Sequence, residues 1–249
     1  MKINLVLSGG AARGIAHIGV IKALEDMGFS IEAVSGSSAG ALVGVFYAGG
    51  YSPEDMLALV KETRWFSLLK PGIPRRGLFS FSKAQATLEE LLGVQRLEDL
   101  GKKVYVCVTD LLSGRTLYLS EGDIVPMILG SCALPGVFEP VRYGNYVFID
   151  GGITNNLPVE PFERSSFVKV GVDVNPMGEV SSVGTMVHVL VRSFFLALRS
   201  NADKRRELCD VLIEPDLLGY SPLNVRKADE LYALGYEKTT AVMERFLGA

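Results

Sequence analysis

A serine flanked by glycines is the group in this sequence best suited to covalent chemistry. The motif is Gly36-x-Ser38-x-Gly40, which has the spacing of a nucleophile elbow. A serine at the tip of a sharp turn between a strand and a helix holds a strained backbone, and flanking glycines avoid clashes there. The turn lifts the hydroxyl clear of the sheet, beside the first N–H groups of the helix, which can stabilise negative charge. Apolar residues at 31–34 and 41–48 predict the required strand and helix. A plain loop rich in glycine and serine has the same pattern.

A second glycine-rich segment lies between a predicted first strand, residues 3–7, and a predicted helix, residues 15–27. Backbone N–H groups in such a loop can face an anion, either a nucleotide phosphate or the oxyanion of a tetrahedral intermediate on Ser38. The loop matches neither the dinucleotide fingerprint Gly-x-Gly-x-x-Gly nor a P-loop. It therefore favours an oxyanion hole, and a nucleotide- or phosphate-binding module stays open as an alternative. The segment reads Ser8-Gly9-Gly10-Ala11-Ala12-Arg13-Gly14.

A base must remove the proton of Ser38 before it can attack, and Asp150 is the favoured candidate. It ends an apolar strand, and partial burial raises the pKa of a carboxyl toward the range of a general base. The histidines His17 and His188 both lie in apolar helical runs, so we expect them to pack. The order Ser38, Asp150, His188 nevertheless matches the chain order of α/β-hydrolase triads, so a triad with His188 remains an alternative.

The elements that must position these groups are strands alternating with helices. This order predicts an α/β fold, a three-layer α/β/α arrangement with a mostly parallel central sheet. The expected strands are 3–7, 31–34, 103–109, 115–119, a hairpin over 141–149, 168–174 and 211–214. The expected helices are 15–27, 41–48, one starting at Ser52, 82–92, 123–133, 183–208 and 227–246.

The segment 65–82 breaks this periodicity. Aromatic and apolar side chains alternate there with prolines, Gly72 and the pair Arg75-Arg76. One interpretation is an irregular surface loop with a few buried anchors. The functional interpretation is a mobile cover over the site, with aromatics for an acyl chain and arginines for an acidic head group or a membrane surface.

Composition limits the classes of function. A chain of 249 residues with 48% apolar residues can bury one core, so a single domain over 1–249 is expected. A net charge of −3 gives no case for nucleic acid binding. Three cysteines without a Cys-x-x-Cys pair argue against a disulfide framework and a zinc site. The N-terminal apolar run is too short for a signal peptide, and no run reaches the ~18 to 20 apolar residues of a membrane span. A cytoplasmic location is expected.

Taken together, the motifs resemble the patatin-like phospholipase family in its bacterial single-domain form. The matching segments occur in the family's order between residues 3 and 175. They are the glycine-rich loop followed by His17-Ile18-Gly19-Val20, Gly36-Ser37-Ser38-Ala39-Gly40, Thr109-Asp110-Leu111 with Ser113-Gly114, Ser131-Cys132-Ala133-Leu134-Pro135-Gly136-Val137-Phe138-Glu139-Pro140, and Asp150-Gly151-Gly152-Ile153-Thr154-Asn155-Asn156-Leu157-Pro158.

The resemblance implies a Ser-Asp dyad hydrolase of acyl esters, typically of phospholipids, lysophospholipids or neutral lipids. Ser38 would be the nucleophile that forms an acyl-enzyme, and Asp150 would take its proton and then activate water. No metal or other cofactor is implied, and the partner is a lipid substrate, with peripheral membrane contact through 65–82. The remaining implied site residues are Gly9, Gly10, Ala11 and Arg13 at the oxyanion hole, Gly36 and Gly40 at the elbow, and Gly14, Gly151 and Gly152 as supports.

One position departs from the family. A third glycine is common where this chain has Ala11. If the loop needs a positive φ angle there, the alanine methyl group will strain it.

Overall fold

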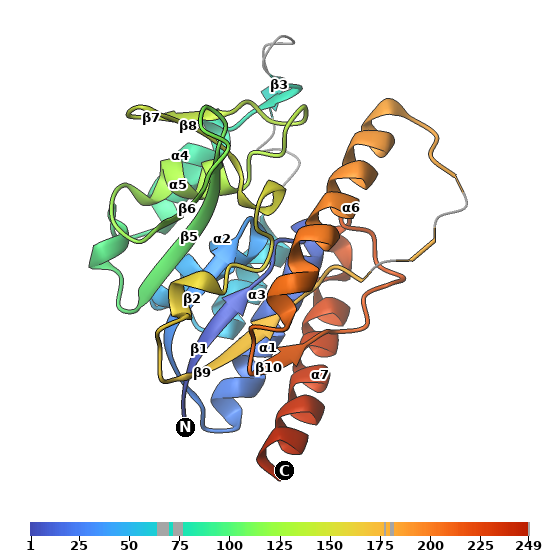
Figure 1. Cartoon of the computed structure of the whole chain (residues 1–249). Helices are drawn as coiled ribbons and strands as arrows, with labels where there is room; N and C mark the ends of the chain where they lie inside the picture. Colours follow the sequence, from blue (N-terminus) through green and yellow to red (C-terminus); the bar gives the residue numbers. More distant parts are fainter. Residues whose placement is uncertain (64–69, 72–76, 177, 180–181, 249) are drawn as a thin grey trace.

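The computed structural model describes residues 1–63, 70–71, 77–176, 178–179 and 182–248 (Figure 1). A central sheet has the strand order β10-β9-β1-β2-β5-β8-β7, and β6 pairs with β5. A separate small sheet pairs β3 with β4. The strands are β1 (Lys2–Leu7), β2 (Ser30–Ser37), β3 (Lys70–Pro71), β4 (Phe79–Ser80), β5 (Lys103–Asp110), β6 (Thr116–Leu119), β7 (Val141–Tyr143), β8 (Tyr146–Asp150), β9 (Val168–Val172) and β10 (Val211–Ile213).

The central sheet is mixed. From β10 to β5 every neighbouring pair is parallel. The pairs of β5 with β6, β5 with β8 and β7 with β8 are antiparallel, and two of them are the hairpins that the sequence predicts. The predicted α/β class is confirmed, with the parallel part of the sheet formed by β10, β9, β1, β2 and β5.

Helices cover both faces of this sheet (Figure 1). They are α1 (Ala16–Asp26), α2 (Ala39–Ala48), α3 (Pro53–Glu62), α4 (Ser82–Leu91), α5 (Ile124–Ser131), α6 (Met186–Arg206) and α7 (Ala228–Gly248). Short 3-10 turns are η1 (Ala11–Ile15), η3 (Leu97–Asp99), η4 (Gly151–Ile153), η5 (Glu160–Phe162) and η6 (Val225–Lys227).

Alternation along β1 shows how the two layers form. Leu5 and Leu7 point into the large core that contains side chains of α1, α2, α3, α5 and α7. Val6 points to the opposite face, where it packs with Phe162 and with Ala202 of α6. Successive side chains of a strand face opposite sides, so a strand buried on both faces reads as a continuous apolar run. This explains why Leu5, Val6 and Leu7 form a continuous apolar run.

The predicted cover, 65–82, falls largely outside the described residues, which omit 64–69 and 72–76. Of its aromatic residues, Phe79 and Phe81 are described. The ring of Phe81 stacks on Phe138 with centroids 4.4 Å apart, and Phe79 lies 6.2 Å from the same ring. These two side chains therefore serve as packing anchors, and the cover itself stays a prediction. Within the described part of the chain, no helix has the length and apolar content to cross a bilayer.

The closest helix packing in the fold is that of α1 against α7. A Cβ atom added to Gly19 of α1 would lie far inside the contact distance of the Tyr232 carbonyl oxygen of α7. The two backbones thus touch without an intervening side chain.

We therefore expect Gly19→Ala to lower the free energy of unfolding by about 1–3 kcal/mol, since overpacking outweighs the better helix propensity of alanine. Chemical denaturation measures it. Gly93→Ala is the control, because nothing lies within 4 Å of a Cβ atom added there. Equal stability of the two variants would show that α1 and α7 can separate freely.

Candidate active site

The register of β5 brings the ends of two strands together. Ser37, the last residue of β2, pairs with Cys107, and Asp150, the last residue of β8, pairs with Val108. Strand β6 pairs with residues 106–109 of β5, and these include residues that also pair with β2 and residues that also pair with β8. Strand β6 therefore occupies one edge of β5, while β2 and β8 share the opposite edge. Because β2 and β8 run in opposite directions, their carboxyl ends meet there. This arrangement makes Ser38 and Asp150 neighbours.

Ser38 sits in the strained turn that the motif predicts. Its φ is 50° and its ψ is −120°, between the end of β2 and the start of α2. A Cβ atom on Gly36 would lie 2.5 Å from the Ala41 nitrogen, and one on Gly40 would lie 2.4 Å from the Leu7 carbonyl oxygen. These positions accept glycine alone, because real Cβ contacts are not that short. The sharp turn therefore depends on both glycines.

Ser131, at the end of α5, braces this turn. The Ser38 N–H donates to Ser131 Oγ at 2.8 Å, and the Ser131 hydroxyl donates to the Cys107 carbonyl at 2.6 Å. Ser38 is therefore tied to the central strand β5 through Ser131. The sequence motif at residues 131–140 contains this serine, but its role as a brace needed the structure.

Asp150 is a buried carboxyl with the pKa of a base that works near neutrality. It is 2% exposed, and the N–H of Gly152 donates to its Oδ1 at 2.8 Å. Burial raises the pKa of Asp150 to about 7, and hydrogen bonds from the Gly152 N–H and the Ser38 hydroxyl limit the rise. Ser38 thus donates toward a carboxylate able to accept its proton. The nearby Cys132 thiol stays neutral, because burial raises its pKa to about 12.

Two asparagines hold the glycine-rich loop from opposite sides. The Gly9 N–H donates to Asn156 Oδ1 at 3.1 Å, and the Gly9 carbonyl accepts from Asn175 Nδ2 at 2.5 Å. The Gly9 N–H, expected among the oxyanion donors, is therefore engaged by Asn156. The Gly9 carbonyl and the Gly10 N–H belong to one trans peptide, so they point in opposite directions. By holding the carbonyl, Asn175 sets the direction of the Gly10 N–H.

The loop also carries the strain that its sequence predicts. Ala11 has a φ of 49°, a conformation that favours glycine. Among the described residues, no hydrogen bond occupies the N–H of Gly10 or of Ala11. A Cβ atom on Gly9 would lie 3.1 Å from the Ser38 Cβ, so the loop runs directly beside the nucleophile. Gly10 and Ala11 can therefore offer free donors to an oxyanion formed there.

Arg13 points to the outer side of this loop. Its Nε donates to the Tyr220 carbonyl at 2.8 Å, and its guanidinium lies 6.0 Å from the centre of the Phe195 ring on α6. Burial and the nearby positive charge of Arg192 lower its pKa. In this structure Arg13 links the loop to α6 and to the segment before η6.

Asn175 is in turn fixed by a buried carboxylate. Asp173 Oδ1 accepts from the Asn175 N–H at 3.0 Å and from its Nδ2 at 3.3 Å. Asp173 Oδ2 pairs with Arg199 of α6 at 3.5 Å. Sequence reasoning missed Asn175, and its one signal was its place just beyond the carboxyl end of a predicted strand. It also missed Asn156 as a contact of the loop, although the motif at 150–158 includes it.

The two histidines lie apart from this chemistry. His17 is fully buried, and its Nε2 donates to the Ser8 carbonyl at 2.8 Å. Burial lowers its pKa to about 4, so the ring is neutral and packs under the loop, as predicted. His188 is exposed in the first turn of α6, and no contact of its ring with Ser38 or Asp150 occurs among the described residues.

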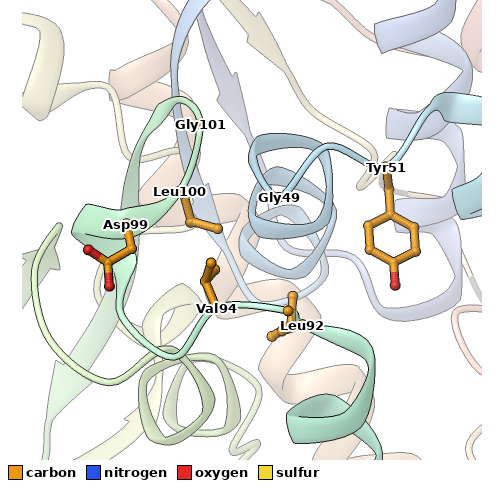
Figure 2. Close-up of a pocket in the computed structure, with 8 residues that line it drawn as sticks. Gly49, Tyr51, Leu92, Val94, Asp99, Leu100 and Gly101 are labelled. Atoms are coloured by element: carbon orange, nitrogen blue, oxygen red, sulfur yellow. The ribbon is translucent and has the colours of Figure 1, made fainter.

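A pocket of about 100 Å³ lies at the far end of α2, and its lining residues are drawn in Figure 2. Gly49, Tyr51, Leu92, Gly93, Val94, Asp99, Leu100 and Gly101 line it. Ser38 precedes the first turn of α2, whereas Gly49 follows the last, and a ten-residue helix is ~15 Å long. The pocket is therefore separate from the dyad.

The comparisons with known proteins point to one family. The family model described as patatin-like phospholipase matches residues 5–163. An uncharacterised NTE family protein of Mycobacterium tuberculosis is 34% identical over 162 residues, which cover 64% of this chain and 45% of the relative. A protein named lysophospholipase nte1 of Aspergillus fumigatus is 26% identical over 267 residues, which cover 94% of this chain and 18% of the relative. The chain thus spans less than half the length of these curated relatives.

Two solved structures share the fold. VipD from Legionella pneumophila aligns with a TM-score of 0.65 at 18% identity, covering 98% of this chain and 67% of that chain. The type III effector protein ExoU aligns with a TM-score of 0.53 at 17% identity, covering 98% of this chain and 53% of that chain. At such identities the likeness concerns the fold.

We expect Asn175→Ala to lower kcat about tenfold to a hundredfold and to leave KM nearly unchanged, because the Gly9–Gly10 peptide loses its anchor and misdirects an oxyanion donor. Steady-state kinetics on a p-nitrophenyl ester measures both constants. Asn145→Ala, at the exposed turn between β7 and β8, is the control for the substitution itself. A wild-type kcat in a folded Asn175→Ala protein would contradict the assignment.

Proposed function

The chain belongs to the patatin-like phospholipase family, as its motifs predict, and from this membership we propose that it is a serine acyl-ester hydrolase of lipids. The observation that carries the proposal is the head-on meeting of β2 and β8, which sets the Ser38 hydroxyl against the buried carboxyl of Asp150. Phospholipase A, lysophospholipase and esterase reactions share this chemistry.

The proposed reaction has two halves. Asp150 accepts the proton of Ser38 as Oγ attacks the ester carbonyl, and the N–H groups of Gly10 and Ala11 stabilise the oxyanion. The intermediate collapses, the alcohol leaves with the proton from Asp150, and an acyl-enzyme remains. Water then attacks the acyl-enzyme while Asp150 takes a proton from it. A second oxyanion forms and collapses, which releases the fatty acid and returns the proton to Ser38.

A lipid ester is the proposed substrate class. The family assignment supports this substrate class, as does the name of the Aspergillus fumigatus relative, lysophospholipase. We further propose that the segment 65–82 contacts the membrane surface while covering the site. Phe79 and Phe81, packed on Phe138, would anchor its C-terminal end.

The first prediction concerns the nucleophile. Ser38→Ala should remove hydrolysis of p-nitrophenyl esters and labelling by a fluorophosphonate, since no acyl-enzyme can form. His188→Ala should keep both, because that side chain is exposed on α6. Full esterase activity in Ser38→Ala would refute the proposal, and loss of activity in His188→Ala would favour a triad.

The second prediction concerns pH. Because Asp150 acts as a base when ionised, kcat/KM should fall about tenfold per unit below its pKa of about 7 and level off above it. Asp150→Asn should remove this dependence together with most of the activity. A flat profile between pH 5 and pH 8 in the wild type would rule out Asp150 as the base.

The same pKa predicts an effect on stability. The carboxyl of Asp150 holds its proton more tightly in the folded protein, where its pKa is about 7, than at its ordinary pKa of 3.8. Its contribution therefore favours folding at low pH and is lost as the pH rises through 7. Asp150→Asn should thus melt above the wild type at pH 8 and lose this advantage toward pH 4, measured by calorimetry. A lower melting temperature at pH 8 would show that the charged carboxylate is well solvated.

A further inference from the structure

The first half of α6 is apolar on both of its sides. Its inner side buries Val191, Phe195 and Leu198 against Leu134. Its outer side is exposed and also apolar over the residues we call the α6 stripe. The α6 stripe consists of Met186, Val189, Leu190 and Leu196, with exposed fractions of 73%, 46%, 40% and 47%.

The stripe is a local feature of the helix. The spacing of its members, at i, i+3, i+4 and i+10, places them along one face of a helix. Beyond Arg199 the outer face becomes polar, with Asp203 and Lys204 exposed. A surface helix in contact with water ordinarily carries polar residues on its outer side throughout. The first half of α6 therefore calls for a partner that is apolar.

The charge around the stripe favours an anionic partner. Residues 180–202 contain no Asp or Glu, although acidic residues occupy 28 of the 249 positions of the chain. Arg192 of this half donates to the Gly178 carbonyl at 2.6 Å, and its charge acts on Arg13. Within the described part of the chain, the arginines of α6 that form ion pairs are Arg199, Arg205 and Arg206, and Arg192 forms none. Positive charge beside apolar side chains is the composition of helices that lie in the head-group region of anionic membranes.

The helix that carries the stripe packs beside the Ser38–Asp150 pair. A Cβ atom on Gly136 would lie 3.6 Å from Leu190 Cδ1, and one on Gly152, the residue that donates to Asp150, would touch Leu198. In Figure 1 the first half of α6, in light orange, projects beyond the strands β1, β2 and β9. A flat surface in contact with the stripe would therefore touch the same helix that packs at Gly152, next to Asp150.

We propose that the α6 stripe docks on the surface of an anionic phospholipid bilayer. The apolar side chains enter the boundary between head groups and acyl chains, and Arg192, on the same half of the helix, faces the phosphates. The choice of a lipid surface rests on the proposed function, because a lipid hydrolase must reach esters at a membrane. The contact is with the bilayer as a surface and is separate from the ester bond that is cleaved.

The test is flotation of the Ser38→Ala protein with vesicles of phosphatidylcholine, with and without phosphatidylglycerol. Using this variant makes binding independent of turnover, so failure of the proposed hydrolysis leaves the test intact. The test variant adds Met186→Gln and Leu196→Gln. The control adds Leu208→Gln instead, because Leu208 is as exposed as Leu196, at 47%, but follows the other end of α6. Melting temperatures verify that each variant is folded.

We expect binding to vesicles with phosphatidylglycerol, at least a tenfold loss of the bound-to-free ratio in the test variant, and no loss in the control. Salt should weaken binding, because the arginine contribution is electrostatic. Equal flotation of the test and control variants overturns the proposal, as does absence of binding by the parent. Light scattering tests the alternative that the stripe binds a second copy of this chain. A dimer formed by the parent and the control but not by the test variant would make the stripe an interface between copies.

Discussion

The geometry of the site depends on how many neighbouring strands can pair with β5. A residue of β5 can pair with one neighbour on each edge, and β6 takes one edge along residues 106–109. Both β2 and β8 must then pair with the opposite edge. There β2 pairs with β5 up to residue 107, and β8 pairs with it from residue 108 onward. Ser38, the proposed nucleophile, and Asp150, the proposed base, lie at this junction. Their separation is thus set by backbone register, which is far stiffer than any loop.

A set of side-chain hydrogen bonds stabilises the strained backbone around the junction. Ser38 and Ala11 both have a positive φ, a conformation that persists where surrounding contacts over-determine it. Ser131 holds the turn of Ser38, while Asn156 and Asn175 hold the two sides of Gly9. These three side chains come from segments distant in sequence. The fold therefore supports the Ser38 turn from the end of α5, and the glycine-rich loop from the segment after β8 and the segment after β9.

Local patterns were enough to predict most of this architecture. The apolar runs predict the strands, the glycine spacing predicts the elbow, and Ser52-Pro53 predicts the start of α3, where Ser52 accepts from Asp55 N–H. The direction of β8 and the partners of Gly9 could not be predicted in this way. They depend on long-range pairing: β8 pairs with β5 through residues such as Val108 and Asp150, and the partners of Gly9 lie 147 and 166 positions away in the sequence. Asn175 shows the limit most clearly, since its type is common in loops and its contact is long-range.

The role of α6 connects the chemistry of the base to the shape of the molecule. Leu198, on its inner side, packs on the position of Gly152, and Leu134 packs on the same cluster beside Ala133, whose carbonyl accepts the Asp150 N–H. These contacts exclude water from the carboxyl, and exclusion of water is the main cause of its raised pKa. A polar inner side would let water in and lower that pKa toward 3.8, which would leave a weaker base. The apolar character of this helix is thus a condition for the proposed proton transfer from Ser38 near neutral pH.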